Sequence, residues 1–159
     1  MNSRLVTVTY IRATAEAVWA ALITPEAIRS YWNGAVHEST WEQGARWTLT
    51  LPDGRVADTG EVLEYHKPRR LSVSWRNEFN KELLAEGYSR CLWEIEPDGA
   101  DVVKLIVTHE IDYPNSKFIA AAANSWPAIL AGLKTLLETG VPLDMSCHWP
   151  SKKLRAGQA

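Results

Sequence analysis

The stretch SKFIAAAANSWPAILAGLKTLLE, residues 116–138, decides the fold because it predicts one long amphipathic helix. Pro127 would either kink this helix or start a new one, and we favour a single kinked helix. Gly140 is a typical C-terminal stop. The apolar side chains recur at spacings of three and four residues, as in a helix with one buried face: Phe118, Ala122, Trp126, Ile129, Leu130, Leu133 and Leu137.

The chain before this helix is mainly strand-like. A strand is expected over residues 4–12, followed by two short helices that begin near Thr14 and Pro25. Residues 77–87 are polar and weakly patterned, which predicts a loop, and Gly60 suggests a bulge. Alternating segments separated by turns predict further strands at 35–40, 46–51, 56–66, 71–76, 88–96 and 101–111.

This order of elements predicts an α+β fold. An antiparallel sheet that receives one late helix must bury the apolar side of that helix against one of its faces. We therefore expect an antiparallel sheet packed against the long C-terminal helix, with two short helices after the first strand. If the sheet is curved, a cavity lies between the sheet and the helix. Residues 1–142 are expected to form one domain, and residues 143–159 a C-terminal tail.

The composition excludes several classes of protein. Hydrophobic residues make up 46% of the 159 residues, and the net charge of −2 offers no basic field for nucleic acid. No signal pattern and no span long enough for a membrane is seen, so we expect a cytoplasmic protein. Cys91 and Cys147, with the scattered histidines, have no metal-ligand spacing, and we expect no metal and no cofactor.

Tryptophan is unusually frequent, with eight tryptophans against two phenylalanines. Each indole carries a large apolar surface and one hydrogen-bond donor that needs a partner. The ordinary interpretation is core packing. Several tryptophans on one face would instead favour a binding cavity.

Several segments resemble a known family. Residues 7–19, TVTYIRATAEAVW, resemble the opening strand and helix of the SRPBCC superfamily, the START-like proteins with a helix-grip fold. Its branch related to activators of the heat-shock chaperone ATPase is similar in four further segments: TPE at 24–26, GEVLE at 60–64, LIVTH at 105–109 and LLETG at 136–140. The resemblance implies a helix-grip fold, in which a curved antiparallel sheet is wrapped around the long C-terminal helix with an apolar cavity between them. Members bind lipids, sterols, polyketides and hormones, and some catalyse cyclisation, dehydration or hydrolysis.

Our first hypothesis is a binding module that holds an apolar or aromatic small molecule between the sheet and the helix. Its partner would be a lipophilic ligand. One apolar face across three strands, opposite an apolar helix, gives the candidate wall residues: Trp32, Leu71, Val73, Trp75, Ser89, Cys91, Trp93, Val107, His109, Phe118, Ala122, Trp126 and Leu130.

The second hypothesis is a cyclase-like or hydrolase-like enzyme. His109 shares its predicted face with apolar residues and is the candidate acid or base. The alternative is a core histidine bonded to a backbone carbonyl or a tyrosine. Cys91 is more readily read as a small buried apolar group than as a nucleophile.

The third hypothesis is a chaperone-activating interaction protein. The eukaryotic activators carry an additional N-terminal domain, whereas this chain starts at the first strand, so we place this hypothesis last. The polar segment 77–87 also holds isolated apolar residues, and we expect Phe79, Leu83 or Leu84 to close one end of the cavity or to contact a second copy in a homodimer. We favour the lid.

Overall fold

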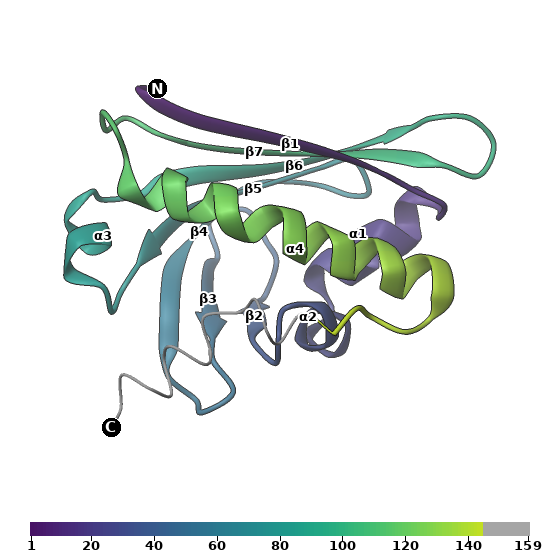
Figure 1. Cartoon of the computed structure of the whole chain (residues 1–159), viewed down its shortest axis with the longest axis horizontal. Coiled ribbons are helices and arrows are strands. Elements are labelled where there is room, and N and C mark those ends of the chain that lie inside the picture. The colour runs from purple at the N-terminus through teal and green to yellow at the C-terminus, as the bar shows by residue number, and fades with distance from the viewer. Residues whose placement is uncertain (145–159) are drawn as a thin grey trace.

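The computed structural model describes residues 1–144, which fold as an α+β unit (Figure 1). The strands are β1 (Ser3–Ile11), β2 (Val36–Ser39), β3 (Arg46–Thr50), β4 (Val56–His66), β5 (Arg70–Asn77), β6 (Ser89–Pro97) and β7 (Val103–Ile111). The helices are α1 (Ala15–Ile23), α2 (Pro25–Tyr31), α3 (Lys81–Ala85) and α4 (Lys117–Thr139). The predicted fold class, a curved sheet with a long C-terminal helix and two short helices after the first strand, is confirmed.

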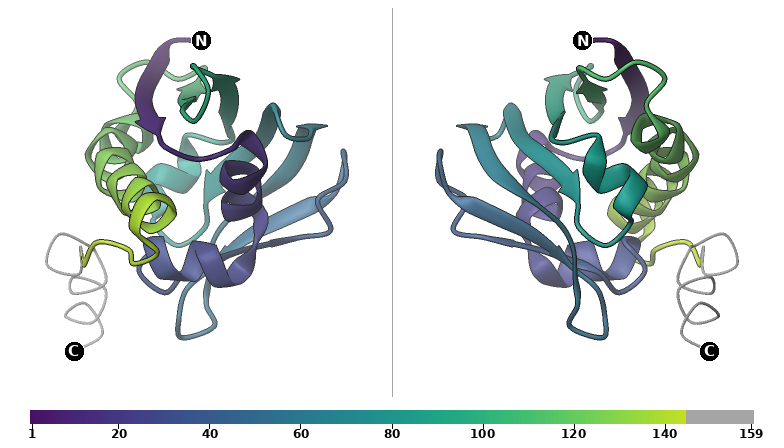
Figure 2. Two further views of the ribbon diagram at one scale, coloured as in Figure 1. Left: turned by 90° about the vertical axis from the view of Figure 1, so that its right-hand side faces the viewer. Right: turned by 90° about the vertical axis from the view of Figure 1, so that its left-hand side faces the viewer.

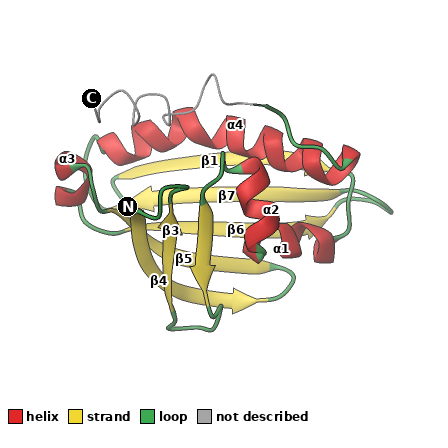
Figure 3. Cartoon of the chain, turned by 90° about the horizontal axis from the view of Figure 1, so that it is seen from below, coloured by secondary structure: helices red, strands yellow, loops and turns green. Residues whose placement is uncertain are grey.

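The sheet is antiparallel throughout the described part of the chain, in the order β1-β7-β6-β5-β4-β3-β2. The first strand therefore lies beside the last, with Leu5 opposite His109. Helix α4 runs along β1 and β7 and contacts both (Figure 3). The end-on views show β3 and β4 extending away from α4, so this half of the sheet curves away from the helix (Figure 2).

Local sequence explains where the N-terminal helices begin. The Thr14 hydroxyl accepts a hydrogen bond from the backbone N–H of Ala17 at 3.1 Å and so caps α1. Pro25 occupies the first turn of α2, where its missing N–H costs nothing. These two helices cover one end of the sheet, since α1 contacts β6 and α2 contacts β2 and α4.

Helix α4 is one continuous helix that passes through Pro127, as predicted. The Ser116 hydroxyl caps it by accepting the backbone N–H of Ile119 at 3.0 Å. At the other end Gly140 has a φ of 83°, a left-handed conformation that glycine adopts without a steric penalty. Both helix ends therefore lie at the residues that the sequence indicated.

The predicted loop over residues 77–87 is wrong in part, because it contains α3. The Asn80 side chain accepts hydrogen bonds from the backbone N–H groups of Glu82 and Leu83, at 3.0 and 3.3 Å, and so starts the helix. The segment is also tied to α4. The Glu86 carboxylate accepts the Ser116 hydroxyl at 2.5 Å and the Lys117 N–H at 2.8 Å.

The predicted bulge at Gly60 is also wrong. The register of β4 against β5 shifts between Val62 and Glu64 instead. Gly60 is required by a close approach, because a Cβ atom there would lie 1.7 Å from the Ser74 carbonyl oxygen and 2.5 Å from Nε1 of Trp47. The Trp47 indole crosses this position to donate to that oxygen at 2.7 Å.

Most of the expected tail, including Cys147, lies outside the described residues. Within residues 1–144, no helix is both long and apolar enough to cross a membrane. The same part of the chain brings no three His, Cys, Asp or Glu side chains together in a group that could hold a metal ion.

Candidate functional site

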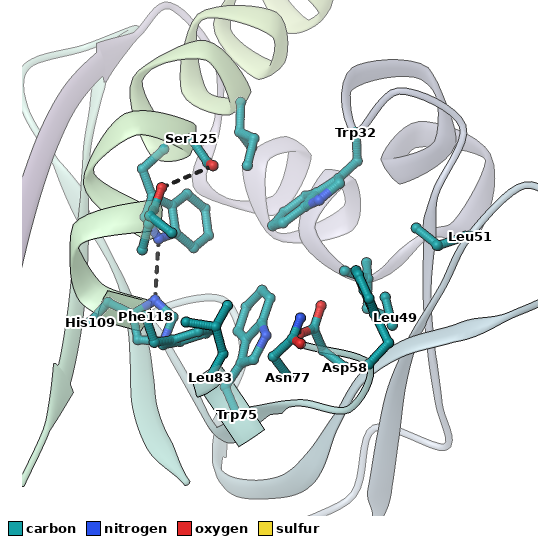
Figure 4. Close-up of a pocket in the computed structure, with 16 residues that line it drawn as sticks. Trp32, Leu49, Leu51, Asp58, Trp75, Asn77, Leu83, His109, Phe118 and Ser125 are labelled. Atoms are coloured by element: carbon teal, nitrogen blue, oxygen red, sulfur yellow. Dashed lines mark hydrogen bonds between the residues drawn. The ribbon is translucent and has the colours of Figure 1, made fainter. Parts of the chain in front are cut away.

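A cavity of about 190 Å³ lies between α4 and the β3–β5 half of the sheet (Figure 4). It lies where the sheet curves away from the helix. Its described lining residues come from both layers and from α3: Trp32, Leu49, Leu51, Ala57, Asp58, Trp75, Asn77, Phe79, Leu83, His109, Phe118, Ala121, Ala122, Ser125, Trp126 and Ile129.

Three tryptophans from different elements form much of the wall. Trp32 follows α2, Trp75 lies in β5 and Trp126 lies in α4. The ring centroid of Trp32 is 5.4 Å from that of Trp126 and 6.0 Å from that of Trp75. All three are almost fully buried. Aromatic faces at these separations create a rigid apolar wall suited to a flat or aliphatic ligand.

The imidazole of His109 is held at both nitrogens. The Trp126 indole donates to Nδ1 at 3.3 Å, so the ring hydrogen is on Nε2, which lies 2.8 Å from the Ser89 hydroxyl. Ser89 in turn donates to the backbone carbonyl of Trp75 at 2.8 Å. Burial lowers the pKa of His109 to about 3, which keeps the ring neutral.

This chain of hydrogen bonds limits what His109 can do. Neither nitrogen is free to take a proton from a ligand or to give one, because each is occupied by a wall residue. The partners are a tryptophan and a serine, not the carbonyl or tyrosine that we considered. The geometry fits a residue that joins α4 to the sheet.

Asp58 is the carboxyl group of the cavity wall. It lies in β4 opposite Asn77 of β5, whose side-chain amide donates to Oδ1 of Asp58 at 3.0 Å (Figure 4). Burial raises the pKa of Asp58 to about 7, against the opposing effects of Asn77 and the Trp75 indole. Protonated and ionised forms therefore coexist near neutral pH.

The structure divides the predicted wall residues into two groups. Those that line the cavity are Trp32, Trp75, His109, Phe118, Ala122 and Trp126. The others lie in the surrounding core, buried between the sheet and the helices: Leu71, Val73, Ser89, Cys91, Trp93, Val107 and Leu130. Burial raises the pKa of the Cys91 thiol, which fits a packing role.

Sequence reasoning missed the polar pair. The period of two that places Val62 inward also places Asp58 inward, because the register of β4 against β5 is unbroken until after Val62. In the same way Asn77 continues the inward face of Trp75. Both residues were overlooked because they are polar, although their positions along the strands predict that they face inward. Other missed lining residues are Leu49, Leu51, Ala57, Ala121, Ser125 and Ile129.

The segment that follows β5 reaches the cavity. Phe79 and Leu83 both line it, and half of the Phe79 side chain is exposed. Leu84 is partly buried and is not among the described lining residues. Two of the three residues considered for the lid therefore lie at the cavity.

Comparison with solved structures supports the fold. Protein MLL2253 from Mesorhizobium loti has a TM-score of 0.73 at 20% identity, over 85% of this chain and 96% of its own. An Hsp90 activator from Plasmodium falciparum has a TM-score of 0.68 at 18% identity, over 84% and 95%. The Aha1 dimer from Colwellia psychrerythraea has a TM-score of 0.69 at 16% identity, over 87% and 98%.

The family assignment comes from sequence. No curated relative was found by sequence comparison. A sequence model of one family, however, matches residues 12–138, which run from the end of β1 almost to the end of α4. The chain belongs to the family of Activator of Hsp90 ATPase homolog 1-like proteins.

Proposed function

We propose that this protein binds an apolar or aromatic small molecule in the cavity between the sheet and α4. The observation that carries the proposal is the cavity itself, whose described wall is almost entirely apolar and includes three tryptophans. Burying the apolar surface of a ligand there is worth about 25 cal/mol per Å². The physiological role of such binding is left unassigned.

A pair of variants in α4 tests this proposal. Ala122 lines the cavity and is partly buried, whereas the adjacent Ala123 is exposed and is not among the lining residues. Ala122→Phe should fill the space and weaken binding of every lipophilic ligand, while Ala123→Phe should leave binding unchanged. Titration of tryptophan fluorescence with a panel of lipophilic compounds measures both. If none of the panel binds the unmodified protein, the proposal fails.

A catalytic role for His109 receives less support. Both of its nitrogens are engaged by Trp126 and Ser89, and its pKa lies far below neutrality. A cyclase-like or hydrolase-like reaction that used His109 as acid or base would first have to break this arrangement. We infer that His109 holds the wall together and does not transfer protons.

The family assignment favours a second candidate, activation of an Hsp90-type ATPase. It is supported by membership of this family and by the similar fold of the Hsp90 activator from Plasmodium falciparum. The test is the ATPase rate of the chaperone with and without this protein. A rate that does not change at saturating concentrations would remove this candidate and leave the ligand proposal standing.

A homodimer is a further proposal. Edge strand β1 exposes Val6, Val8 and Tyr10, each at more than two fifths of its surface, on the side away from α4. Strand β1 is the last in the order of the described sheet, so its free backbone edge can pair with a second copy and the exposed apolar side chains can pack there. A structure of similar fold is described as a dimer. Light scattering measures the mass in solution, and Val8→Lys should shift any dimer toward monomer.

A further inference from the structure

Asp58 differs in kind from the rest of the cavity wall. It is only 6% exposed, yet it lies among Leu49, Ala57 and Trp75 in a mainly apolar lining. A carboxyl group in such a place costs free energy to bury. The adjacent Asn77 fixes its orientation, because the Asn77 side-chain oxygen accepts the backbone N–H of Asn80 at 2.8 Å and so turns the amide nitrogen toward Asp58.

The other polar side chains of the described lining already have partners within the protein. His109 is bonded at both nitrogens. The Ser125 hydroxyl donates to the backbone carbonyl of Ala121 at 3.1 Å. A carboxylate offers about four acceptor positions, and among the described residues the side chains that donate toward Asp58 are the Asn77 amide and the Trp75 indole. Asp58 therefore keeps acceptor capacity that a ligand can use.

The charge of the cavity lining also favours a hydrogen-bond donor over an acidic ligand. None of the described lining residues is a lysine or an arginine. Glu78 directly follows β5 and acts on Asp58 through its charge. Its carboxylate disfavours a second negative charge nearby. A ligand carboxylate in this cavity would therefore meet negative charge whenever Asp58 is ionised, and no described lining residue supplies a cation to compensate it.

From this arrangement we infer that the cavity selects lipophilic molecules with a hydroxyl or amine group that donates a hydrogen bond to Asp58. Molecules that carry a carboxylate are rejected. This inference rests on the proposed binding function and narrows it to a class of ligand. The apolar body packs against Trp32, Trp75 and Trp126, and the donor group lies at the β4–β5 floor. Asn77 acts as the positioning residue for the carboxyl.

Four naphthalenes of the same substitution pattern test the inference by isothermal titration calorimetry. Naphthylmethanol and naphthylmethylamine carry a donor, ethylnaphthalene has the same shape without one, and naphthoate carries a negative charge. We expect the two donors to bind about tenfold more tightly than ethylnaphthalene, because a hydrogen bond to a carboxylate is stronger than one between neutral groups. Naphthoate should bind most weakly.

The matched variant is Asp58→Asn, which preserves the shape of the side chain and removes its charge. It should abolish the preference for the amine, whereas Asp98→Asn, in the exposed β6–β7 turn, should preserve it. As a measurement that needs no variant, the carboxyl carbon resonance of Asp58 in the unmodified protein should shift on addition of naphthylmethanol and stay in place with ethylnaphthalene.

The outcomes distinguish failure of the proposed binding function from failure of the inference about Asp58. Equal affinity for donors and ethylnaphthalene, or tight binding of naphthoate, overturns the inference and leaves the cavity a general lipophilic site. Binding of none of the four overturns the proposed function and the inference together. A preference for naphthylmethylamine that disappears in Asp58→Asn and persists in Asp98→Asn supports both the proposed function and the inference.

Discussion

The indole nitrogen of Trp126 lies 3.3 Å from Nδ1 of His109 and donates its hydrogen to it, which joins α4 to β7 inside the core. Both residues are almost fully buried, at 3% and 1% exposure. A buried acceptor that loses its partner carries a desolvation penalty, so this bond matters more when broken than its length alone suggests.

Trp126→Phe is therefore expected to lower the free energy of unfolding by about 1–3 kcal/mol beyond the loss of packing. Urea denaturation measures the change. In a His109→Leu background the same substitution should cost only the packing contribution, because no acceptor is left unpaired. A double-mutant cycle with no coupling between the two positions would contradict the hydrogen bond.

The buried histidines His37 and His109 should make the protein less stable in acid. Burial lowers the pKa of both His37 and His109 to about 3, whereas the unfolded chain has the ordinary value of 6.5. Between these values the unfolded state binds more protons, so each histidine lowers the free energy of unfolding by up to about 1.4 kcal/mol per unit of falling pH.

His37→Phe isolates one of these contributions. Nε2 of His37 has no hydrogen-bond partner within residues 1–144, and its ring packs against Trp32, Trp47 and Trp75. A phenyl ring keeps those contacts, so the variant should be at least as stable as the unmodified protein at neutral pH. Its advantage should grow as the pH falls below about 6.5, and urea denaturation across this range would refute the assignment if the two curves stayed parallel.

Asp58 should change the free energy of unfolding with pH in the opposite direction from the two histidines. Its folded pKa of about 7 lies above the ordinary value of 3.8, so its contribution to stability is present at low pH and is lost as the pH rises to 7. Asp58→Asn should match the unmodified protein near pH 4 and exceed its unfolding free energy by roughly 1–3 kcal/mol above pH 7. Because the histidines are common to both proteins, their contribution cancels in the difference. An equal difference at all pH values would contradict the raised pKa.

Gly60→Ala should be strongly destabilising. The new Cβ atom would overlap the Ser74 carbonyl oxygen, and the Trp47 indole would lose its place over β4. We expect a loss of about 3 kcal/mol or more in thermal or urea unfolding. The control is Gly132→Ala in α4, whose Cβ would lie 3.4 Å from Cβ of Tyr31 and should change stability by less than about 1 kcal/mol.

Glu86 tests the connection between α3 and α4. Its carboxylate accepts the Ser116 hydroxyl and the backbone N–H groups of Lys117 and Phe118, at the positive end of the helix dipole. Glu86→Ala should cost about 1–2 kcal/mol of unfolding free energy. In the described part of the chain the Glu82 carboxylate pairs with the exposed amine of Lys117, so Glu82→Ala should have little effect. Equal effects of the two substitutions would argue against the cap.

The fold could be predicted because its signals are local and repeated. Alternation along β5 to β7, the period of α4 and the stop at Gly140 each follow from neighbouring residues. The site was harder to predict, because it depends on where a curved sheet leaves space. Trp93 and Leu130 share faces with cavity residues, yet they lie where the sheet and helix meet closely.

The two polar residues at the floor of the cavity could be predicted only with the strand register, which the sequence does not state directly. Asp58 faces inward because β4 and β5 stay in step until after Val62, and a shift earlier in the strand would have turned it outward. Asn77 looked like the start of a loop because it is polar and precedes a charged segment. Its function in the fold, to orient Asp58, depends on a partner nineteen residues away.

The tryptophan cluster has an optical consequence. Trp75 lies 4.7 Å from Trp47, 6.2 Å from Trp126 and 6.3 Å from Trp93, measured between ring centroids. At these separations the ultraviolet transition dipoles of neighbouring indoles couple, so the cluster absorbs and rotates polarised light as one excitonic chromophore. Circular dichroism of the unlabelled protein should therefore carry an indole couplet superimposed on its backbone signal. Since Trp75 and Trp126 line the cavity, the sign and splitting of that couplet report directly on whatever enters it.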